Sequence, residues 1–365
     1  MAEDVSVRDK QVAAPRRQAG VRWLKRGALL LGLLVLCGGG LLLLPRPLPD
    51  AVTAHAQPPL EPFSLYVARR NAQARQEGVR PGNEERVAWW NPLAPDTRAP
   101  VVLLYVHGFG ASRAEGEATV EPIAQALHAT TYYTRLPGHG GDLERHAAAR
   151  PEQYFALLEE DFHRLRPLGD KFVVIGSSTG GLLAAWLAAR HPTQVDAVVL
   201  GSPLVEMAAP GAFLLSRRWG LGLVQAMLGE YRDAGWRVDP EKRKQLGYED
   251  FWITRQRMSA IGIVEDVRRQ ALREAPAADI TAPILLFYYY ADKEHQDDVC
   301  RVSAMRAYVA GANHGSPHPQ TRSVAIADGN HILFSRYVRT DKDTIGRELL
   351  SFLHAVLQNG NHAGP

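Results

Sequence analysis

The stretch FVVIGSSTGGLLAAWLAAR, residues 172–190, decides the fold of this chain. It opens with an apolar run typical of a buried parallel strand and ends in a segment rich in helix formers. Between them, GSSTG at residues 176–180 has glycine two positions before and two positions after a serine. This spacing predicts a strand–turn–helix elbow so sharp that only the smallest residues fit beside the serine. The register selects Ser178 as the candidate nucleophile, because Ser177 has no glycine at either position.

A second apolar run, residues 101–106, leads directly into the segment HGFG at residues 107–110. An acyl carbonyl attacked by Ser178 would become an oxyanion, which needs N–H donors already in place. Beside an elbow of this kind, the donors are the amide after the nucleophile and an amide from the loop after an earlier strand. We therefore expect the backbone N–H groups of Thr179 and Phe109 to form the oxyanion hole. We interpret His107 as a support for the loop and not as the catalytic base.

The remaining catalytic groups are expected in the order serine, acid, histidine. A strand of strong β-formers at residues 284–290 is followed by Asp292, and an acid just past the carboxyl end of a strand lies at the functional edge of an open α/β sheet. The next strand, residues 323–327, leads to His331. We expect His331 to take the proton of Ser178 and Asp292 to fix the tautomer of His331.

Other residues near these strands are alternatives for the same roles. His314 is the serious rival to His331 as the base. The assignment of the acid has more alternatives, since Glu294, Asp297 and Asp298 lie in the same loop as Asp292. Asp297 is the first alternative.

Taken together, the motifs resemble those of α/β-hydrolases in the group of monoacylglycerol lipases and bacterial carboxylesterases, sometimes filed with serine aminopeptidases. The matching segments are HGFG at 107–110, RLPGHG at 135–140, the elbow around Ser178, Asp292 and GNH at 329–331. The resemblance spans roughly residues 80–357 and implies an α/β-hydrolase fold, with a mostly parallel central sheet and helices on both faces. The chain departs from the group in the acid loop, where Tyr-Ala precedes the acid and the interval to the histidine is long.

The N-terminal region carries a second strong signal. Residues 27–44 are 18 uncharged, leucine-rich residues, which as a helix would span about 27 Å, just enough for a hydrocarbon core. Residues 1–26 hold seven Lys and Arg against three Asp and Glu. The positive-inside rule therefore predicts a signal anchor with a cytoplasmic segment at 1–26 and the catalytic domain on the extracytoplasmic, periplasmic-type side of the membrane. The alternative is export with cleavage at the small-x-small site of residues 54–56.

Behind the anchor we expect a linker at 45–61, a hydrolase domain at 62–357 and a tail at 358–365. About 80 residues separate the strand at 197–201 from the strand at 284–290, far more than one crossover helix needs. Hydrolases of the resembled group carry a cap in this place, and we expect a helical cap at about 204–280. Together, its many aromatic residues favour an apolar acyl pocket, although each one taken singly is explained better as part of the cap's own core.

Composition excludes several classes of function. The net charge of +3 is small and much of it lies in the N-terminal segment, so we expect no nucleic-acid partner. Two cysteines, Cys37 and Cys300, cannot form a disulfide framework. Metal-ligand spacings and a dinucleotide fingerprint are absent from the sequence, and the expected chemistry needs no cofactor.

These residues predict a serine hydrolase that cleaves carboxylic esters, lipid-like or monoacylglycerol-like, through an acyl-enzyme on Ser178. The expected partners are a small ester substrate and a membrane reached through the N-terminal helix. The alternatives are an amidase or peptidase, an acyltransferase that uses the same triad, or an inactive hydrolase-like binding module.

Overall fold

The computed structural model describes residues 44–48, 61–234, 241, 244–245 and 247–359. The expected anchor at 27–44 therefore lies outside the described residues except for Leu44, as do residues 49–60 of the expected linker and residues 360–365 of the expected tail. No helix within the described ranges is both long enough and apolar enough to cross a membrane.

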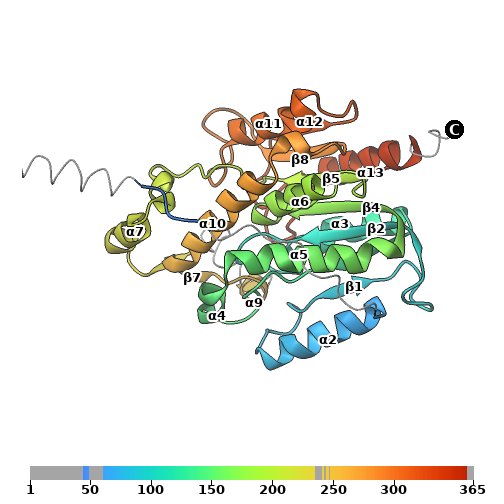
Figure 1. Cartoon of the computed structure of the whole chain (residues 1–365), viewed down its shortest axis with the longest axis horizontal. Helices are drawn as coiled ribbons and strands as arrows, with labels where there is room; N and C mark the ends of the chain where they lie inside the picture. Colours follow the sequence, from blue (N-terminus) through green and yellow to red (C-terminus); the bar gives the residue numbers. More distant parts are fainter. Residues whose placement is uncertain (1–43, 49–60, 235–240, 242–243, 246, 360–365) are drawn as a thin grey trace, which may run out of the picture.

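A seven-stranded sheet forms the centre of the domain (Figure 1), in the order β1-β3-β2-β4-β5-β8-β9. The strands are β1 (Arg86–Ala88), β2 (Ala99–Val106), β3 (Ala129–Tyr133), β4 (Gly169–Ser177), β5 (Ala197–Gly201), β8 (Ile284–Tyr289) and β9 (Arg322–Ile326). Only β1 is antiparallel to its neighbour, and the other pairs are parallel. The expected mostly parallel sheet is confirmed.

Helices cover both faces of this sheet because its central strands are apolar on both sides. In β2, Val102 and Leu104 point into one buried cluster while Val101 and Leu103 point into another, as the two-residue period of a strand requires. The first cluster is closed by α2 (Phe63–Gln76), α5 (Pro151–Leu165), α6 (Thr179–Arg190) and α11 (Val302–Ala310). The second is closed by α3 (Glu117–Ala126) and α13 (Lys342–Asn359).

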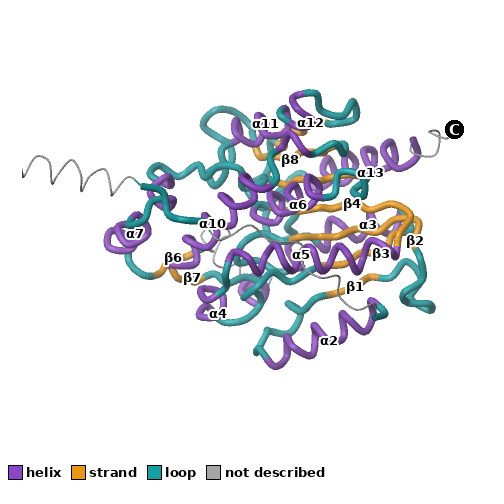
Figure 2. The backbone as a smooth tube through the Cα atoms, in the orientation of Figure 1, coloured by secondary structure: helices purple, strands orange, loops and turns teal. Residues whose placement is uncertain are grey.

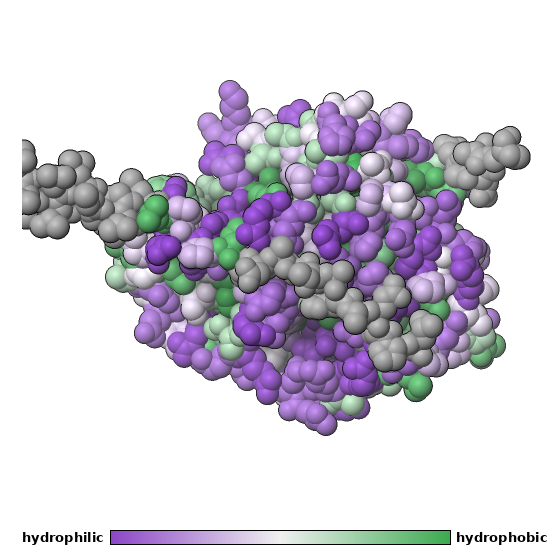
Figure 3. Space-filling view, in the orientation of Figure 1, coloured by the Kyte–Doolittle hydropathy of each residue, from purple (hydrophilic) through white to green (hydrophobic). Residues whose placement is uncertain are grey.

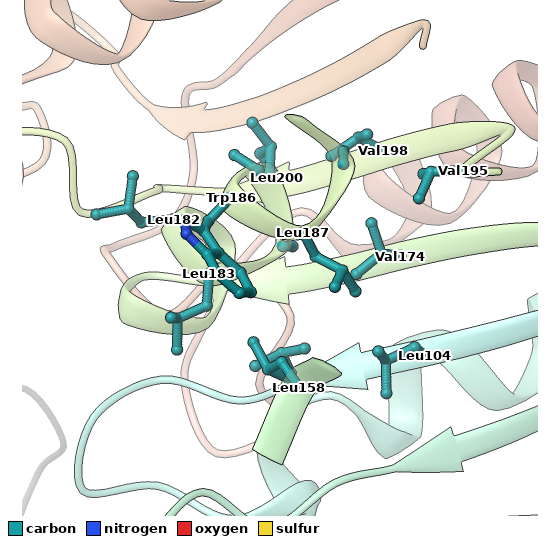
Figure 4. Packing of buried hydrophobic residues seen from close by; sticks show 14 of the residues in the cluster. Leu104, Leu158, Val174, Leu182, Leu183, Trp186, Leu187, Val195, Val198 and Leu200 are labelled. Atoms are coloured by element: carbon teal, nitrogen blue, oxygen red, sulfur yellow. The ribbon is translucent and has the colours of Figure 1, made fainter. Parts of the chain in front are cut away.

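Helix α6, which begins directly after Ser178, is apolar from Gly180 to Ala189 and is buried up to Ala189. Figure 4 shows Leu183, Trp186 and Leu187 of this helix packed among side chains of β2, β4, β5 and α5. Trp186 is fully buried. A helix enclosed in this way is a rigid support for the turn at its N-terminus.

Between β5 and β8 the chain forms a separate layer, which we call the cap. Within the described residues its elements are η3 (Ala212–Ser216), α7 (Gly220–Leu228), β6 (Tyr231–Asp233), α9 (Tyr248–Phe251), β7 (Arg255–Arg257), α10 (Met258–Glu274) and η4 (Ala277–Asp279). The cap is mainly helical, but β6 and β7 form a small antiparallel sheet that the sequence pattern did not predict (Figure 2). Short elements elsewhere are η1 (Arg113–Glu115), α4 (Leu143–Ala148), η2 (Arg166–Leu168) and α12 (Ala312–Gly315).

Candidate active site

Ser178 lies at the junction of β4 and α6 in a strained backbone conformation. Its φ is 53° and its ψ is −117°, a region that a residue with a side chain rarely adopts. The Ser178 N–H donates to the Gly201 carbonyl at 2.8 Å, and the Ser178 carbonyl accepts from the Leu204 N–H at 3.0 Å. The neighbouring strand β5 and the loop after it therefore hold the strained turn in place.

The glycines around Ser178 are required by direct contact between backbones. A Cβ added at Gly176 would lie 2.2 Å from the Gly180 carbonyl oxygen, and one added at Gly180 would lie 2.1 Å from the Val106 carbonyl oxygen. Both distances are far below van der Waals contact. The steric argument that selected Ser178 over Ser177 from the sequence therefore matches the geometry of the turn.

His331 lies between Ser178 and a buried carboxylate. Its Nε2 is 2.8 Å from the Ser178 Oγ, and its Nδ1 is 2.8 Å from Oδ2 and 3.0 Å from Oδ1 of Asp297. Ser178 is 8% exposed and His331 6%. A serine, an imidazole and a carboxylate in this order can move a proton from the hydroxyl to the ring while the carboxylate stabilises the resulting cation.

The expectation that Asp292 orients His331 is wrong. Asp292 is exposed, and its carboxylate lies 2.9 Å from the Nδ1 of His295 instead. After β8 the chain reverses in a short hairpin, in which the Asp297 N–H donates to the Tyr289 carbonyl at 3.1 Å. This reversal brings Asp297, the first alternative for the acid, back to the carboxyl end of β8 and leaves Asp292 at the tip of the hairpin.

Asp297 is held as an ionised acceptor. Besides His331, it accepts the backbone N–H groups of Val299 and Cys300, each at 2.9 Å. Burial alone would raise the pKa of Asp297, but the electrostatic interaction with the His331 ring and the hydrogen bonds outweigh it, so the pKa lies below its ordinary value. The carboxylate is therefore charged when His331 accepts a proton.

The rival base His314 is placed far from this edge of the sheet. It is exposed in α12, which precedes the N-terminal end of β9, whereas His331 follows the carboxyl end of that strand. In a parallel sheet these are opposite edges, so the two histidines cannot exchange roles.

The loop HGFG after β2 presents one unengaged amide beside the nucleophile. The Gly108 N–H donates to Glu115 at 2.7 Å and the Gly110 N–H donates to the Nε2 of His139 at 2.9 Å. Within the described residues, the N–H groups of Phe109 and Thr179 donate to no protein acceptor. These two amides are the ones that the sequence predicted for the oxyanion hole, and their role stays a prediction.

His107 connects two loops through hydrogen bonds. Its Nδ1–H donates to the Gly108 carbonyl at 2.8 Å, and its Nε2 accepts the Leu136 N–H at 3.2 Å. Burial lowers the pKa of His107 to about 4, so the ring is neutral near pH 7. A neutral ring with both nitrogens engaged fits the interpretation of His107 as a loop support.

Glu115 is a buried residue near the site that the sequence reasoning missed. Its carboxylate accepts from the Gly108 N–H at 2.7 Å and from the Ser177 hydroxyl at 3.0 Å. It therefore joins the HGFG loop to the residue before the nucleophile. Burial raises the pKa of Glu115 above its ordinary value. In the sequence it stands in a polar segment with no periodic signal, so nothing marks it as buried.

The cap closes over the same loop. The Ile253 N–H donates to the Gly110 carbonyl at 2.7 Å, and Phe109 packs against a small apolar cluster of the cap. That cluster contains Leu215, Met258 and Ile261. The cap thus places apolar side chains next to the loop that carries one of the two free amides.

One group in the described part of the chain has donor atoms close enough to surround a metal ion: Glu159, His163 and His191. It borders a cavity of about 830 Å³ beside α5. His191 caps the far end of α6, and twelve residues of helix separate it from Ser178 by about 18 Å. The Glu159 carboxylate is already paired with His191 at 2.8 Å and lies 3.5 Å from Arg190. The positive charge of Arg190 would repel a metal ion at this position.

The sheet, elbow and cap define an α/β-hydrolase fold. A solved lipolytic enzyme of metagenomic origin superposes with a TM-score of 0.57 at 18% identity, over 76% of this chain and 99% of that one. Residues 97–314 match the family described as Serine aminopeptidase, S33, and the chain belongs to that family of hydrolases.

Two curated relatives are more similar in sequence. A pimeloyl-[acyl-carrier protein] methyl ester esterase of Vibrio cholerae is 32% identical over 111 residues, which are 30% of this chain and 40% of the relative. A thermostable monoacylglycerol lipase of a Bacillus species is 27% identical over 197 residues, which are 54% of this chain and 71% of the relative.

Proposed function

We propose that this protein hydrolyses carboxylic esters through an acyl-enzyme on Ser178. The observation that carries the proposal is the position of His331, with Nε2 2.8 Å from the Ser178 Oγ and Nδ1 2.8 Å from the Asp297 carboxylate. Ser178 attacks the ester carbonyl while His331 takes its proton and Asp297 stabilises the imidazolium. His331 then protonates the departing alcohol, and a water activated by the same ring releases the acid.

The negative charge of the tetrahedral intermediate is assigned to the amides of Phe109 and Thr179. Both amides lie in segments fixed by buried contacts: α6 supports Thr179, while Glu115 and His139 hold the residues on either side of Phe109. Donors positioned before the reaction need no reorganisation when the charge develops, which is the main source of their effect.

The substrate is proposed to be an ester with an apolar acyl group, such as a monoacylglycerol. The cap places Leu215, Met258 and Ile261 beside Phe109, so an acyl chain next to the oxyanion hole would meet hydrocarbon. Two of the relatives support the ester class, since both bear names of ester-cleaving enzymes. An amidase or peptidase, an acyltransferase and an inactive binding module remain the alternatives.

The proposed location rests on the N-terminal sequence. We propose that residues 27–44 anchor the chain in a membrane, with the hydrolase domain on the extracytoplasmic side. Cleavage at residues 54–56 followed by release is the alternative, and the mass of the mature protein distinguishes the two.

The test is a chain-length series of esters, from acetyl to palmitoyl, together with a monoacylglycerol, using the full chain in detergent. Ser178→Ala is the control, and it should lower turnover by several orders of magnitude. Matched anilides test the amidase alternative, and added alcohols test acyl transfer. If wild type and Ser178→Ala leave every ester intact, the ester hydrolase proposal fails.

A further inference from the structure

The first described residues of the chain are attached to the cap. The Arg218 N–H donates to the Leu44 carbonyl at 3.2 Å, and the Arg46 N–H donates to the Ser216 carbonyl at 2.7 Å. Pro45 forms an isolated antiparallel bridge with Arg217. The segment at 44–48 therefore lies along η3 and the turn before α7, and is not a free linker there (Figure 1).

The side chain of Arg46 strengthens this attachment. Its guanidinium donates to Asp266 at 2.8 Å and to the Gly262 carbonyl at 2.7 Å, both on α10. Arg269 of the same helix donates in turn to the Arg46 carbonyl at 2.8 Å. The Arg46–Asp266 pair is mostly buried, with side chains 21% and 17% exposed. Charge-assisted bonds with this burial hold a short segment in one orientation.

Large apolar side chains are exposed next to this attachment. We call Leu44, Phe213, Met227 and Leu228 the cap apolar patch; their exposures are 42%, 61%, 69% and 67%. Phe213 belongs to η3, and Met227 and Leu228 end α7, a helix whose nine residues include no charge. Figure 3 shows hydrophobic residues at the end of the molecule formed by α7. Exposed apolar side chains gathered at one end of a molecule mark an interaction surface.

The position of the patch beside the end of the apolar segment at 27–44 indicates what covers it. Leu44 is the last residue of the 18 uncharged residues at 27–44. If these residues cross a membrane, Leu44 lies at the membrane surface, and its attachment to η3 brings the cap to the same depth. Arg218, which is exposed beside Leu44, is suited to the headgroup layer. A second copy of the chain would not explain why the patch begins at the end of the apolar segment.

We propose that the cap apolar patch is a membrane-contact surface whose partner is the lipid bilayer that holds the anchor. The attachment through Arg46 fixes the orientation, so the patch faces the acyl boundary while the opposite side of the cap faces Phe109. The ester would then pass from the bilayer to Ser178 beneath the cap without crossing bulk water. This inference rests on the proposed anchor and on the proposed hydrolase activity.

A depth measurement tests the contact. The full chain carrying Cys37→Ala and Met227→Cys is labelled with the environment-sensitive fluorophore NBD and reconstituted in vesicles of phosphatidylethanolamine and phosphatidylglycerol. Cys300 is fully buried and should not label in the folded protein. The matched control is Leu93→Cys, at a side chain that is 97% exposed in the loop between β1 and β2. We expect lipid-borne nitroxide to quench the label at 227 at least fivefold more strongly than the label at 93.

Two results would overturn the proposal: equal quenching at the two positions, or a blue-shifted label at 227 that lipid nitroxide does not quench. The second result would mean that the patch is covered by protein, either residues 27–43 or another copy. In addition, Arg46→Ala should reduce quenching at 227, because the cap is then no longer held at the membrane surface.

Activity measurements separate the membrane-contact proposal from the proposals of an anchor and of hydrolase activity. The double variant Met227→Glu with Leu228→Glu should hydrolyse a monoacylglycerol in the vesicles about tenfold more slowly, with turnover of a short soluble ester within twofold of wild type. Leu93→Glu should change neither rate. Equal rates on the vesicle substrate would contradict the contact. Loss of wild-type protein from carbonate-washed vesicles would refute the anchor, and inactivity on all esters would refute the hydrolase assignment.

Discussion

Replacing Asp297 by asparagine should abolish most of the activity while preserving the fold. The Asp297 carboxylate accepts the Nδ1–H of His331, which leaves Nε2 unprotonated and 2.8 Å from the Ser178 Oγ. An asparagine amide in the same place can donate to Nδ1, which would stabilise the other tautomer and put a proton on Nε2. A ring in that state cannot accept the serine proton. In serine proteases the corresponding change lowers kcat about 10⁴-fold, equivalent to about 5.5 kcal/mol in the barrier.

The matched control is Asp292→Asn, five residues earlier in the same hairpin. Asp292 is exposed and pairs with His295, so its replacement should leave kcat/KM within about twofold of wild type. The assay is hydrolysis of a short p-nitrophenyl ester near pH 8 by the full chain in detergent, with the melting temperature measured for each variant. A loss of three orders of magnitude in Asp292→Asn with near-normal Asp297→Asn would refute the assignment of the acid.

Three further predictions concern the buried residues around the site and the core. Glu115→Gln should lower kcat about tenfold with little change in KM, since it weakens the hydrogen bonds to the oxyanion loop and to Ser177, each worth about 0.5–1.5 kcal/mol. Gly180→Ala places a Cβ 2.1 Å from a backbone oxygen and should cost about 3 kcal/mol, or roughly 6–12 °C in Tm, whereas Gly222→Ala meets open space and should not lower Tm. Burial raises the pKa of Asp161 to about 7 from 3.8, so wild-type stability should fall as pH rises through this window, and Asp161→Asn should remove up to about 4 kcal/mol of that fall.

Each of these has a decisive measurement. For Glu115→Gln, steady-state kinetics would contradict the positioning role if KM rose and kcat did not change. For the glycine pair, calorimetry giving equal Tm values for Gly180→Ala and Gly222→Ala would show that the elbow accommodates the added methyl group without loss of stability. For Asp161, urea titrations at pH 4, 5.5 and 8 would contradict the account if wild type and Asp161→Asn changed stability in parallel.

The elbow was predictable because its cause is local. A serine between a strand and a helix needs glycines wherever backbones approach, and Gly176 and Gly180 each meet a carbonyl oxygen closer than any Cβ allows. The parallel sheet was predictable for a similar reason, because continuous apolar runs such as that of β2 are stable only between two layers of helices. His331 was predicted from its place after the last strand, with His314 left as its rival.

The triad acid was mispredicted because the sequence does not show which path the loop takes after a strand. Asp292 stands nearer to the end of β8, but a hairpin closed by the Asp297 N–H and the Tyr289 carbonyl returns the later residue to the sheet edge. Glu115 was missed for a comparable reason, since its burial depends on contacts with segments distant in the chain. The attachment of Arg46 to Asp266 joins positions 220 residues apart, and no local pattern predicts such a pair.

The most direct test of the central claim is to trap the acyl-enzyme. The full chain is mixed with a slowly hydrolysed long-chain ester, quenched in acid within one turnover and analysed by peptide mass spectrometry. The account predicts the mass of one acyl group on the peptide that contains Ser178, stoichiometric in wild type, accumulating in His331→Ala only far more slowly, and absent in Ser178→Ala. Ester turnover that persists in Ser178→Ala, with no acyl group on that peptide in wild type, would contradict it.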